Sequence, residues 1–402
     1  MKKFISYNES LEILQNITPP TLATQKLFIT QAIGRILACD IIANHNSPEF
    51  PTSAMDGYAI KFEDQALKQL LLTDKNPAGS VVESSVTTGT CIKTFTGSLM
   101  PKGSDTLIPI ENVSVEGNNI IINEPVPQNF ATREVGESYK KDEVLIQKGT
   151  LIDFAQIGVM ASLNIAQVEV YAKPVVAIAS TGSEILDIGQ EQTNEAQIRS
   201  SNHLTLEAIA TKYGAQVHQM GVVKDDKDSI TNLLQNALKN ADIVVTTGGV
   251  SVGDYDYVKD IIKETLGANV LFQGVNIKPG QHILFAQKEG KFIIGLPGFA
   301  YSSTVTFLLY VLPLIFKYKG SYEVLEIIDA IIEQDFAKKA PKTIFTACNL
   351  HYKNGNYTID FKNKKQGTSA ILTNLLGEAG LLIQNVDSCA LKTGDTVKVI
   401  KL

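Results

Sequence analysis

A glycine- and hydroxyl-rich loop with two carboxylates carries the clearest chemistry in this sequence. The loop is TTGGVSVGDYDY, residues 246–257, placed between a β-branched run typical of a buried strand and a segment with helical apolar spacing. Backbone N–H groups at a helix N-terminus favour an anion, and Gly248 and Gly249 would let it approach closely. Asp254 and Asp256 would repel a bare phosphate unless a cation lies between them. The loop therefore predicts a phosphate-bearing ligand together with Mg²⁺.

Further carboxylates follow two neighbouring predicted strands. Glu184 lies in STGSEI after the run VVAIAS, and Asp225 and Asp226 lie in KDDKDS after QVHQMGVV. Because parallel strands end at one edge of a sheet, these carboxylates and Asp256 are expected to share a Mg²⁺ ion with phosphate oxygens and water. For the KDDKDS aspartates an equally good explanation is a favourable interaction with the dipole of the following helix.

Two turns offer further contacts for an anion. NIKPG places Lys278 before a Pro-Gly turn, where its ammonium could meet an oxyanion, although a turn lysine is more often simply solvated. GLPG, which contains Pro297, precedes Ser302 at a predicted helix start. This segment could be an anion-binding turn or an ordinary helix cap. No Ser/His/Asp or Cys/His arrangement is evident, so covalent catalysis has no support.

These residues must be positioned by several domains. After Pro48 and Pro51, short β-type runs broken by turn residues predict an all-β module of about a hundred residues, in which GNN is a hairpin turn. If residues 1–45 and 137–170 belong together, this module is an insertion. Past Lys173 the strands alternate with helices, which predicts a doubly wound α/β domain with a parallel sheet. The last eighty or so residues read as a small β module.

The composition excludes several classes of protein. The chain has 402 residues, 44% of them hydrophobic, and a net charge of -6, so we expect no nucleic-acid or membrane-surface partner. The first residues lack the apolar core of a signal peptide, and the run 307–316 is too short to span a bilayer. A cytoplasmic protein with reduced thiols is expected, because no metal-ligand spacing joins the cysteines Cys39, Cys91, Cys348 and Cys389.

Motifs from several predicted domains occur in the order found in one known family. They are PEFPTSAMDGYAI, TFTGSLMPKGSDTLI, VVAIASTGSEI, IRSSN, TTGGVSVGDYDYVKD, NIKPG and GLPGFAYSS. Together they resemble the molybdopterin molybdotransferases, the MoeA and gephyrin E-domain family, over nearly the whole chain. A single motif such as TGG is a weak signal, whereas the ordered set is specific.

The resemblance implies a multidomain fold that combines α/β and all-β parts. An elongated N-terminal dimerisation domain would comprise residues 1–45 and 140–170, with an inserted β domain at 46–139. A doubly wound α/β domain of MoaB/MogA type, which binds molybdopterin and carries catalysis, would span 171–320. A C-terminal β-barrel-like domain would follow at 321–402.

The resemblance also implies a reaction. Family members insert molybdate into adenylylated molybdopterin, with Mg²⁺-dependent release of AMP, in molybdenum cofactor biosynthesis. They are homodimers whose cleft lies between the α/β and C-terminal domains of one subunit and the β domain of the other, and an adenylyltransferase would deliver the pterin. The implied site residues are Asp56 and Thr96 from the second subunit, Glu184, Asp225, Asp226 and Asp256 for Mg²⁺ or water, and Gly248, Gly249, Ser251, Lys278, Pro297 and Ser302 for phosphate or molybdate.

The chain departs from the family pattern around the implied molybdate pocket. Gln281 stands where the family commonly has a second lysine, and Ala347 stands about where an oxyanion-binding arginine is often found. Phe299 and Ala300 replace the usual NP of GLPGNP, and Ser138 replaces an acid. The lost positive charge keeps a second hypothesis open, a catalytically weak molybdopterin-binding or scaffolding paralogue. A molybdopterin adenylyltransferase is a third, against which the motifs outside the α/β domain weigh.

Overall fold

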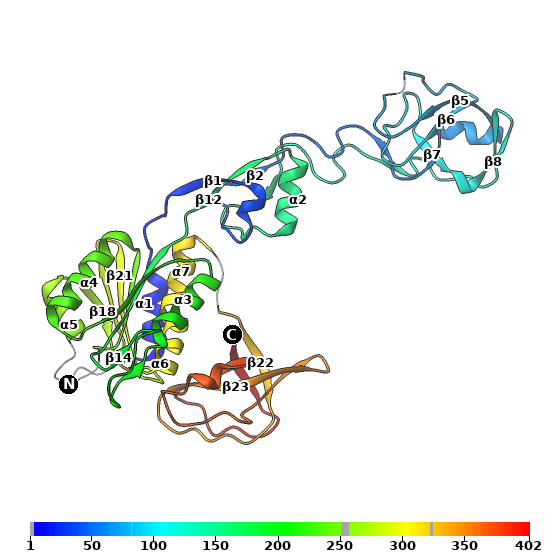
Figure 1. The fold of residues 1–402 in the computed structure, drawn as a ribbon. Helices are drawn as coiled ribbons and strands as arrows, with labels where there is room; N and C mark the ends of the chain where they lie inside the picture. The colour runs from blue at the N-terminus through cyan, green and yellow to red at the C-terminus, as the bar shows by residue number, and fades with distance from the viewer. Residues whose placement is uncertain (1–3, 82, 251–256, 322–324) are drawn as a thin grey trace.

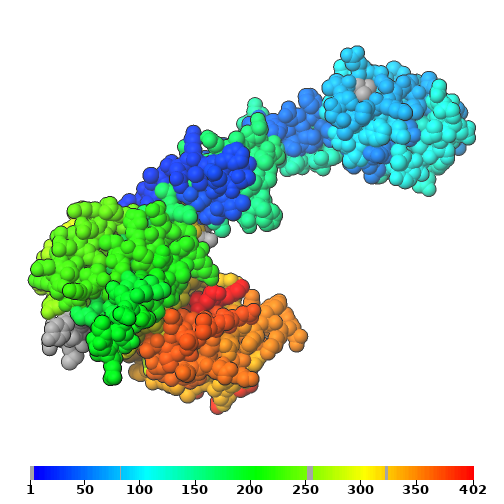
Figure 2. Space-filling model, in the orientation of Figure 1, coloured from blue at the N-terminus to red at the C-terminus, as the bar shows by residue number. Residues whose placement is uncertain are grey.

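The computed structural model describes residues 4–81, 83–250, 257–321 and 325–402. The molecule is elongated: an inserted β domain lies at one end, a narrow middle segment follows, and an α/β domain with a C-terminal β domain forms the other end (Figures 1 and 2). The predicted combination of α/β and all-β parts is confirmed. The domain boundaries themselves stay predictions.

The middle segment is built from two stretches that lie far apart in the sequence. Strand β1 (Thr24–Phe28) pairs antiparallel with β12 (Gln167–Tyr171), and β2 (Ile41–Ile42) pairs with β11 (Val144–Ile146). Between them lie the 3₁₀ turn η1 (Ile29–Ala32) and helix α2 (Phe154–Ser162), which begins with a capping box from Asp153. These pairings make the β region an insertion, because both of its ends return to the same segment.

The inserted domain is a six-stranded sheet of order β7-β4-β6-β5-β9-β8. The expected GNN hairpin is present, since β8 and β9 pair antiparallel around a turn at Gly117, where φ is +59°. A small pair, β3 and β10, lies beside the sheet. The elements are β3 (Thr52–Ser53), β4 (Gly57–Ile60), η2 (Phe62–Leu67), β5 (Gln69–Asn76), β6 (Thr90–Thr94), β7 (Thr106–Pro109), η3 (Ile110–Asn112), β8 (Val113–Glu116), β9 (Asn119–Ile122) and β10 (Thr132–Arg133).

The α/β domain has a sheet of order β16-β13-β17-β21-β20-β18, in which the first four strands are parallel. Successive side chains of β13 face two different cores: Val176 and Ile178 pack with α3, whereas Ala177 and Ala179 pack with α4. The elements are β13 (Val175–Thr181), β14 (Ile185–Leu186), β15 (Ile198–Arg199), α3 (Asn202–Lys212), β16 (Gln216–Val223), α4 (Lys227–Asn240), β17 (Ile243–Thr247), α5 (Tyr257–Asp260), η4 (Ile261–Thr265), β18 (Asn269–Gln273), β20 (Leu284–Lys288) and β21 (Lys291–Leu296).

The most apolar segment forms a helix through the core of this domain. It consists of α6 (Ala300–Thr306), the π-helical η5 (Phe307–Val311) and α7 (Leu312–Lys319). Within the part of the chain that the structure describes, this 20-residue helix alone is long and apolar enough to span a membrane, and 83% of the segment is buried inside the protein. Packing against the sheet and against α1 (Tyr7–Asn16) therefore accounts for its apolar character.

The C-terminal domain is a closed barrel. Strands β23 (Thr343–Lys353), β24 (Asn356–Asp360), β22 (Ile327–Ile332), β26 (Thr396–Lys401) and β25 (Ala379–Gln384) pair in that order, and β25 returns to β23. A 3₁₀ turn, η6 (Leu372–Leu375), precedes β25. The α/β domain contributes one strand to the outside of the barrel, because β19 (Ile277–Lys278) runs parallel to β23.

Candidate active site

Four parallel strands of the α/β domain end at one edge. Thr181 at the end of β13 is in register with Val223 of β16, and Thr247 at the end of β17 is in register with Leu296 of β21. The loops that follow leave the sheet on the same side, as expected for a ligand-binding edge. The predicted site residues that they carry are Glu184, Asp225, Asp226, Gly248, Gly249 and Pro297.

Packing explains why glycines follow β17. Gly248 and Gly249 have φ values of +97° and +66°, which disfavour other residues. A Cβ on Gly248 would lie 2.7 Å from the carbonyl oxygen of Thr181, and one on Gly249 would lie 2.5 Å from Cγ2 of Val258. The two glycines therefore let the loop pack closely, and their contact with an anion stays a prediction. Three other loop residues from the sequence analysis, Ser251, Asp254 and Asp256, lie outside the described residues.

The carboxylates at this edge differ in what they contact. Asp226 caps α4, accepting hydrogen bonds from the backbone N–H and the hydroxyl of Ser229 at 2.8 and 2.7 Å, and these bonds lower the pKa of Asp226. Glu184 is exposed and Asp225 is half-buried. Among the described residues, no group of three or more His, Cys, Asp or Glu side chains could hold a metal ion. The described donors alone thus do not form a Mg²⁺ site.

The α/β domain is fastened to the barrel beside this edge. Tyr301 on α6 donates its hydroxyl hydrogen to the carbonyl of Phe345 at 3.0 Å and accepts from the N–H of Ala347 at 2.8 Å. Burial raises the pKa of Tyr301, so it stays a neutral donor. The N–H of Ser302 donates to the carbonyl of Ser369 at 3.2 Å. Ser302 is buried against the barrel and also lines the second pocket described below, so its predicted contact with the ligand stays a prediction.

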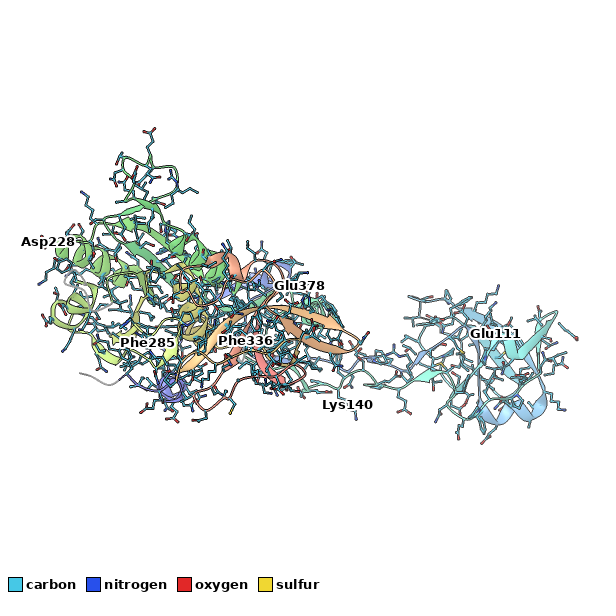
Figure 3. The ribbon with its side chains drawn as sticks, turned by 90° about the horizontal axis from the view of Figure 1, so that it is seen from below. Glu111, Lys140, Asp228, Phe285, Phe336 and Glu378 are labelled. Carbon is cyan, nitrogen blue, oxygen red and sulfur yellow. The ribbon has the colours of Figure 1, made fainter. Side chains whose placement is uncertain are left out.

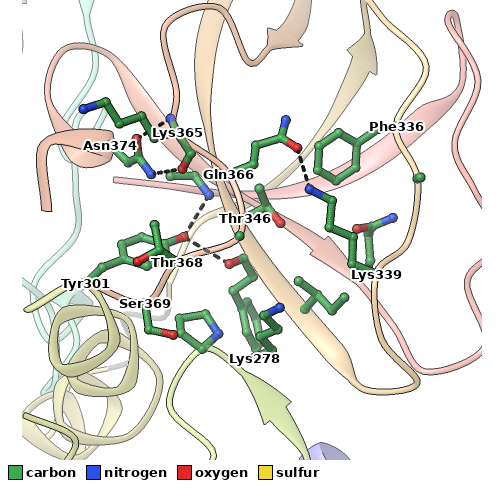
Figure 4. A pocket seen from close by; sticks show the side chains of 17 residues that line it. Lys278, Tyr301, Phe336, Lys339, Thr346, Lys365, Gln366, Thr368, Ser369 and Asn374 are labelled. Atoms are coloured by element: carbon green, nitrogen blue, oxygen red, sulfur yellow. Dashed lines mark hydrogen bonds between the residues drawn. The ribbon is translucent and has the colours of Figure 1, made fainter. Parts of the chain in front are cut away.

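Two adjoining pockets lie between these domains. The first has an empty volume of about 580 Å³, part of it open to solvent, and Figure 4 shows its lining, with Lys278 and Lys339 beside it. The second pocket is lined by Lys278, Lys342, Pro297 and Ser302. Among the described residues, no Asp or Glu side chain lines either pocket. The gap between the domains is therefore positively charged in a protein whose net charge is -6.

Two of these lysines are held by neutral amides. Lys342 donates to the side-chain oxygen of Gln281, and Lys339 donates to that of Gln366 at 3.1 Å. An amide oxygen orients an ammonium without cancelling its charge. Lys365 also lines the first pocket, but its side chain extends away from Lys278 and Lys339 (Figure 4).

The sequence analysis missed both amide-held lysines. Lys339 and Lys342 come from KKAPK and Gln366 from KKQG, segments with no recognisable motif. Local basic character was their only signal in the sequence. The neutral residue at position 281, which seemed to remove charge from the pocket, instead holds a lysine supplied by the C-terminal domain.

A third group of predicted residues lies far from this gap within one chain. The backbone N–H and hydroxyl of Thr96 donate to one carboxylate oxygen of Asp56 at 2.8 and 2.7 Å, which lowers the pKa of Asp56. The pair belongs to the inserted β domain. Figure 3 shows Glu111 of that domain at one end of the molecule and Phe336, which lines the first pocket, in the body on the other side of Lys140. One chain thus brings Asp56 and Thr96 together but does not bring them to the lysines.

Comparison with known proteins identifies this arrangement. Residues 5–164 match the model of the MoeA N-terminal region (domain I and II), and residues 177–317 match that of a probable molybdopterin binding domain. The crystal structure of the molybdopterin biosynthesis moeA protein from Pyrococcus horikoshii OT3 superposes with a TM-score of 0.85 and 30% identity, covering 100% of both chains. Fold and site define a multidomain protein of the MoeA class.

Curated relatives narrow this class to a family. The chain is 35% identical over 324 residues to a molybdopterin molybdenumtransferase of Staphylococcus aureus (strain Mu50), covering 79% of this chain and 77% of the relative. It is 33% identical over 311 residues to that of Haemophilus influenzae, covering 77% and 76%. The chain belongs to the molybdopterin molybdenumtransferase family, and the predicted resemblance and enzyme class are confirmed.

Proposed function

We propose that this protein inserts molybdate into adenylylated molybdopterin, with Mg²⁺-dependent release of AMP. The observation that carries the proposal is the gap lined by Lys278, Lys339 and Lys342 and by no described carboxylate. Molybdate and the pterin phosphates are all anions, and ammonium groups held by neutral partners stabilise them most where water is partly excluded. Lys278 lines both pockets and so would contact ligands in either.

The other side of the proposed site is the strand-end edge. There the Gly248 loop would hold the phosphate, and Asp256 with Glu184 and Asp225 would hold Mg²⁺, which neutralises charge on the anhydride when bound. Because the described residues alone do not complete a metal site, a Mg²⁺ titration is a separate test of this assignment. Activity that is unchanged after complete removal of divalent ions would exclude it.

We further propose that the active unit is a homodimer. Large apolar side chains of the middle segment are exposed, and a second copy would remove them from water. Such a dimer would also bring Asp56 and Thr96 to the lysine-lined gap of the other subunit. The exposed side chains are Phe28 (49%), Ile33 (57%), Ile42 (50%), Val144 (47%), Leu151 (39%) and Phe154 (79%). We place this dimer in the cytoplasm, where an adenylyltransferase would supply its substrate.

The decisive experiment combines purified protein, adenylylated molybdopterin, Mg²⁺ and a molybdate titration, and it follows AMP release and metal insertion together. Release of AMP coupled to metal insertion is the expected result. No AMP release at any molybdate concentration would overturn the transferase proposal. Tight binding of the pterin without turnover would instead support a scaffolding protein.

Subunit mixing tests the shared site. At a molybdate concentration that is half-maximal for the wild type, Asp56→Ala and Lys278→Ala chains should each have little activity as homodimers. Unfolding and refolding them together should restore activity at up to about a quarter of the sites, since half of the dimers are mixed and each mixed dimer contains one intact site. No recovery from correctly folded mixed dimers would show that the site lies within one chain.

A further inference from the structure

A buried histidine lies beneath the strand-end edge and has no role in the function proposed so far. His203 on α3 is 2% exposed. Its Nδ1 lies 2.8 Å from the hydroxyl of Ser200, and its Nε2 lies 3.2 Å from a carboxylate oxygen of Asp187. The sequence analysis found no Ser/His/Asp arrangement, and the structure assembles one because the β14–β15 excursion places Asp187 against α3.

The contacts continue from Ser200 to the glycine loop. The Ser200 hydroxyl lies 3.2 Å from that of Ser180, and Ser180 lies 2.9 Å from the hydroxyl of Thr247, the residue before Gly248. Ser180 and Thr247 are buried, whereas Ser200 is partly exposed. A continuous hydrogen-bonded chain thus joins Asp187, whose side chain is 32% exposed, to the predicted phosphate loop.

Two proton arrangements fit this geometry. When the imidazole is neutral, Nε2–H donates to Asp187 and Nδ1 accepts the hydroxyl hydrogen of Ser200. When it is protonated, both ring nitrogens donate, and the Ser200 hydrogen turns toward Ser180. The direction of the Ser200 hydroxyl therefore reports the charge of His203.

We propose that Ser200 is a catalytic residue that takes the proton of the water attacking the phosphoanhydride, with His203 and Asp187 as positioning residues. As the water oxygen forms its bond to phosphorus, its proton moves to Ser200 Oγ and the Ser200 proton moves to His203 Nδ1. The bond from phosphorus to the bridging oxygen breaks, and the leaving phosphate keeps that electron pair. Asp187 stabilises the imidazolium. This role rests on the proposed function and deepens it.

The charged surroundings of His203 agree with this role. Asp187 is the carboxylate at the ring itself. From β16, Gln219 donates to the backbone carbonyl of His203 at 2.9 Å and to the carboxylate of Glu207 at 2.8 Å, which keeps Glu207 on the backbone side. A single carboxylate, that of Asp187, thus faces the ring among these contacts.

The test is the pH profile of kcat for AMP release in the His203→Gln and Ser200→Ala variants of the full chain. In the wild type, the profile should have an acid limb, because a protonated ring cannot accept from Ser200. His203→Gln should lower kcat by about 100-fold and remove this acid limb while KM changes little. A matched control is His351→Gln, since His351 forms the same Nε2-to-carboxylate contact with Asp360 at 3.0 Å on the barrel.

Each possible result of these measurements either supports or overturns the proposed role of Ser200. If His203→Gln and Ser200→Ala keep the wild-type kcat and acid limb, the inference is wrong while the transferase proposal stands. If kcat falls but the acid limb remains, the hydrogen bonds from Asp187 to Ser200 have only a structural role. Should His203→Gln fail to fold, Asp187→Asn supplies a variant at a less buried position, and it should shift the acid limb to lower pH because the imidazolium loses its carboxylate. An unshifted limb in Asp187→Asn would also overturn the inference.

Discussion

The lysine-lined gap and the strand-end edge are built from opposite chemistry. The gap presents Lys339 and Lys342 from the C-terminal domain, each held by a glutamine. The strand-end edge carries Glu184, Asp225 and the Asp187–His203 pair. Because charges of one sign are kept together and away from their opposites, neither set neutralises the other. Under the proposed function, this difference would separate two tasks, the binding of anions in the gap and the handling of cations and protons at the edge.

The gap and the edge also differ in how far apart their parts lie in the sequence. Lys342 meets Gln281 across two domains, whereas Ser200 and His203 share the start of one helix. The lysine-lined gap therefore depends on how the domains are joined, and the strand-end edge depends on one sheet. Substitutions can weaken one without the other, and the predictions below use that independence.

The largest effect is expected at Lys278, which lines both pockets. Lys278→Ala should raise the molybdate concentration needed for half-maximal AMP release by about 10- to 100-fold, because a hydrogen bond to a charged group is worth about 1.5–3 kcal/mol. Lys398→Ala is the control, since Lys398 pairs with Asp329 on the surface of the barrel. Equal effects of the two variants would show that Lys278 does not bind the anion in the proposed way.

Lys342 should have the next largest effect. Lys342→Met keeps the aliphatic stem but removes the charge. We expect the molybdate concentration needed for half-maximal AMP release to rise about tenfold, with little change in Tm. Lys339→Met, at the first pocket, shows whether both lysines bind the same anion. If neither substitution alters the titration, the amide-held lysines do not bind the substrate.

Gln281→Lys should have little effect. The departure from the family pattern alone predicts that this change tightens molybdate binding. The structure predicts a change of less than about threefold, because a new ammonium would repel Lys342, which already supplies the charge at this place. A molybdate titration compares the variant with wild type. Much tighter binding would show that Lys342 does not compensate for the missing lysine.

The smallest effect on activity is expected at Asp226. Both carboxylate oxygens accept from Ser229, so Asp226→Asn should leave the Mg²⁺ requirement of AMP release unchanged and lower Tm by on the order of 2 °C. The lowered pKa of Asp226 means that its contribution to stability is present above the unfolded pKa of about 3.9 and is lost as the pH falls through the folded value.

Two measurements check this prediction. Thermal unfolding of wild type and Asp226→Asn should differ at neutral pH and converge in acid. A Mg²⁺ titration should give the same midpoint for both proteins. A raised midpoint for Asp226→Asn would show that Asp226 binds Mg²⁺ and does not only cap α4.

Local patterns were sufficient to predict the elements that carry the site. The hairpin of β8 and β9 and the parallel strands with polar residues at their ends follow from periodicity and turn residues. The order of motifs was sufficient for the family. These features depend on residues that are close in the sequence, which is why they could be read from it.

Side-chain partners from distant segments could not be predicted in this way. Lys342 and Gln281 meet because β19 pairs with β23, and Asp187 meets His203 because residues 187–198 fold back on α3. The bond from the N–H of Ser302 to the barrel likewise joins segments that are distant in the sequence. In each case the partner is fixed by tertiary contacts.

The pairing of β19 with β23 has a consequence for selectivity. Neighbouring strands lie about 4.8 Å apart, so the pairing of β19 with β23 fixes the distance between the backbone of Lys278 and the barrel wall. A gap of fixed width distinguishes ligands by size and charge. Under the proposed function, this spacing alone would not separate tetrahedral oxyanions of equal charge and similar radius, such as molybdate and tungstate.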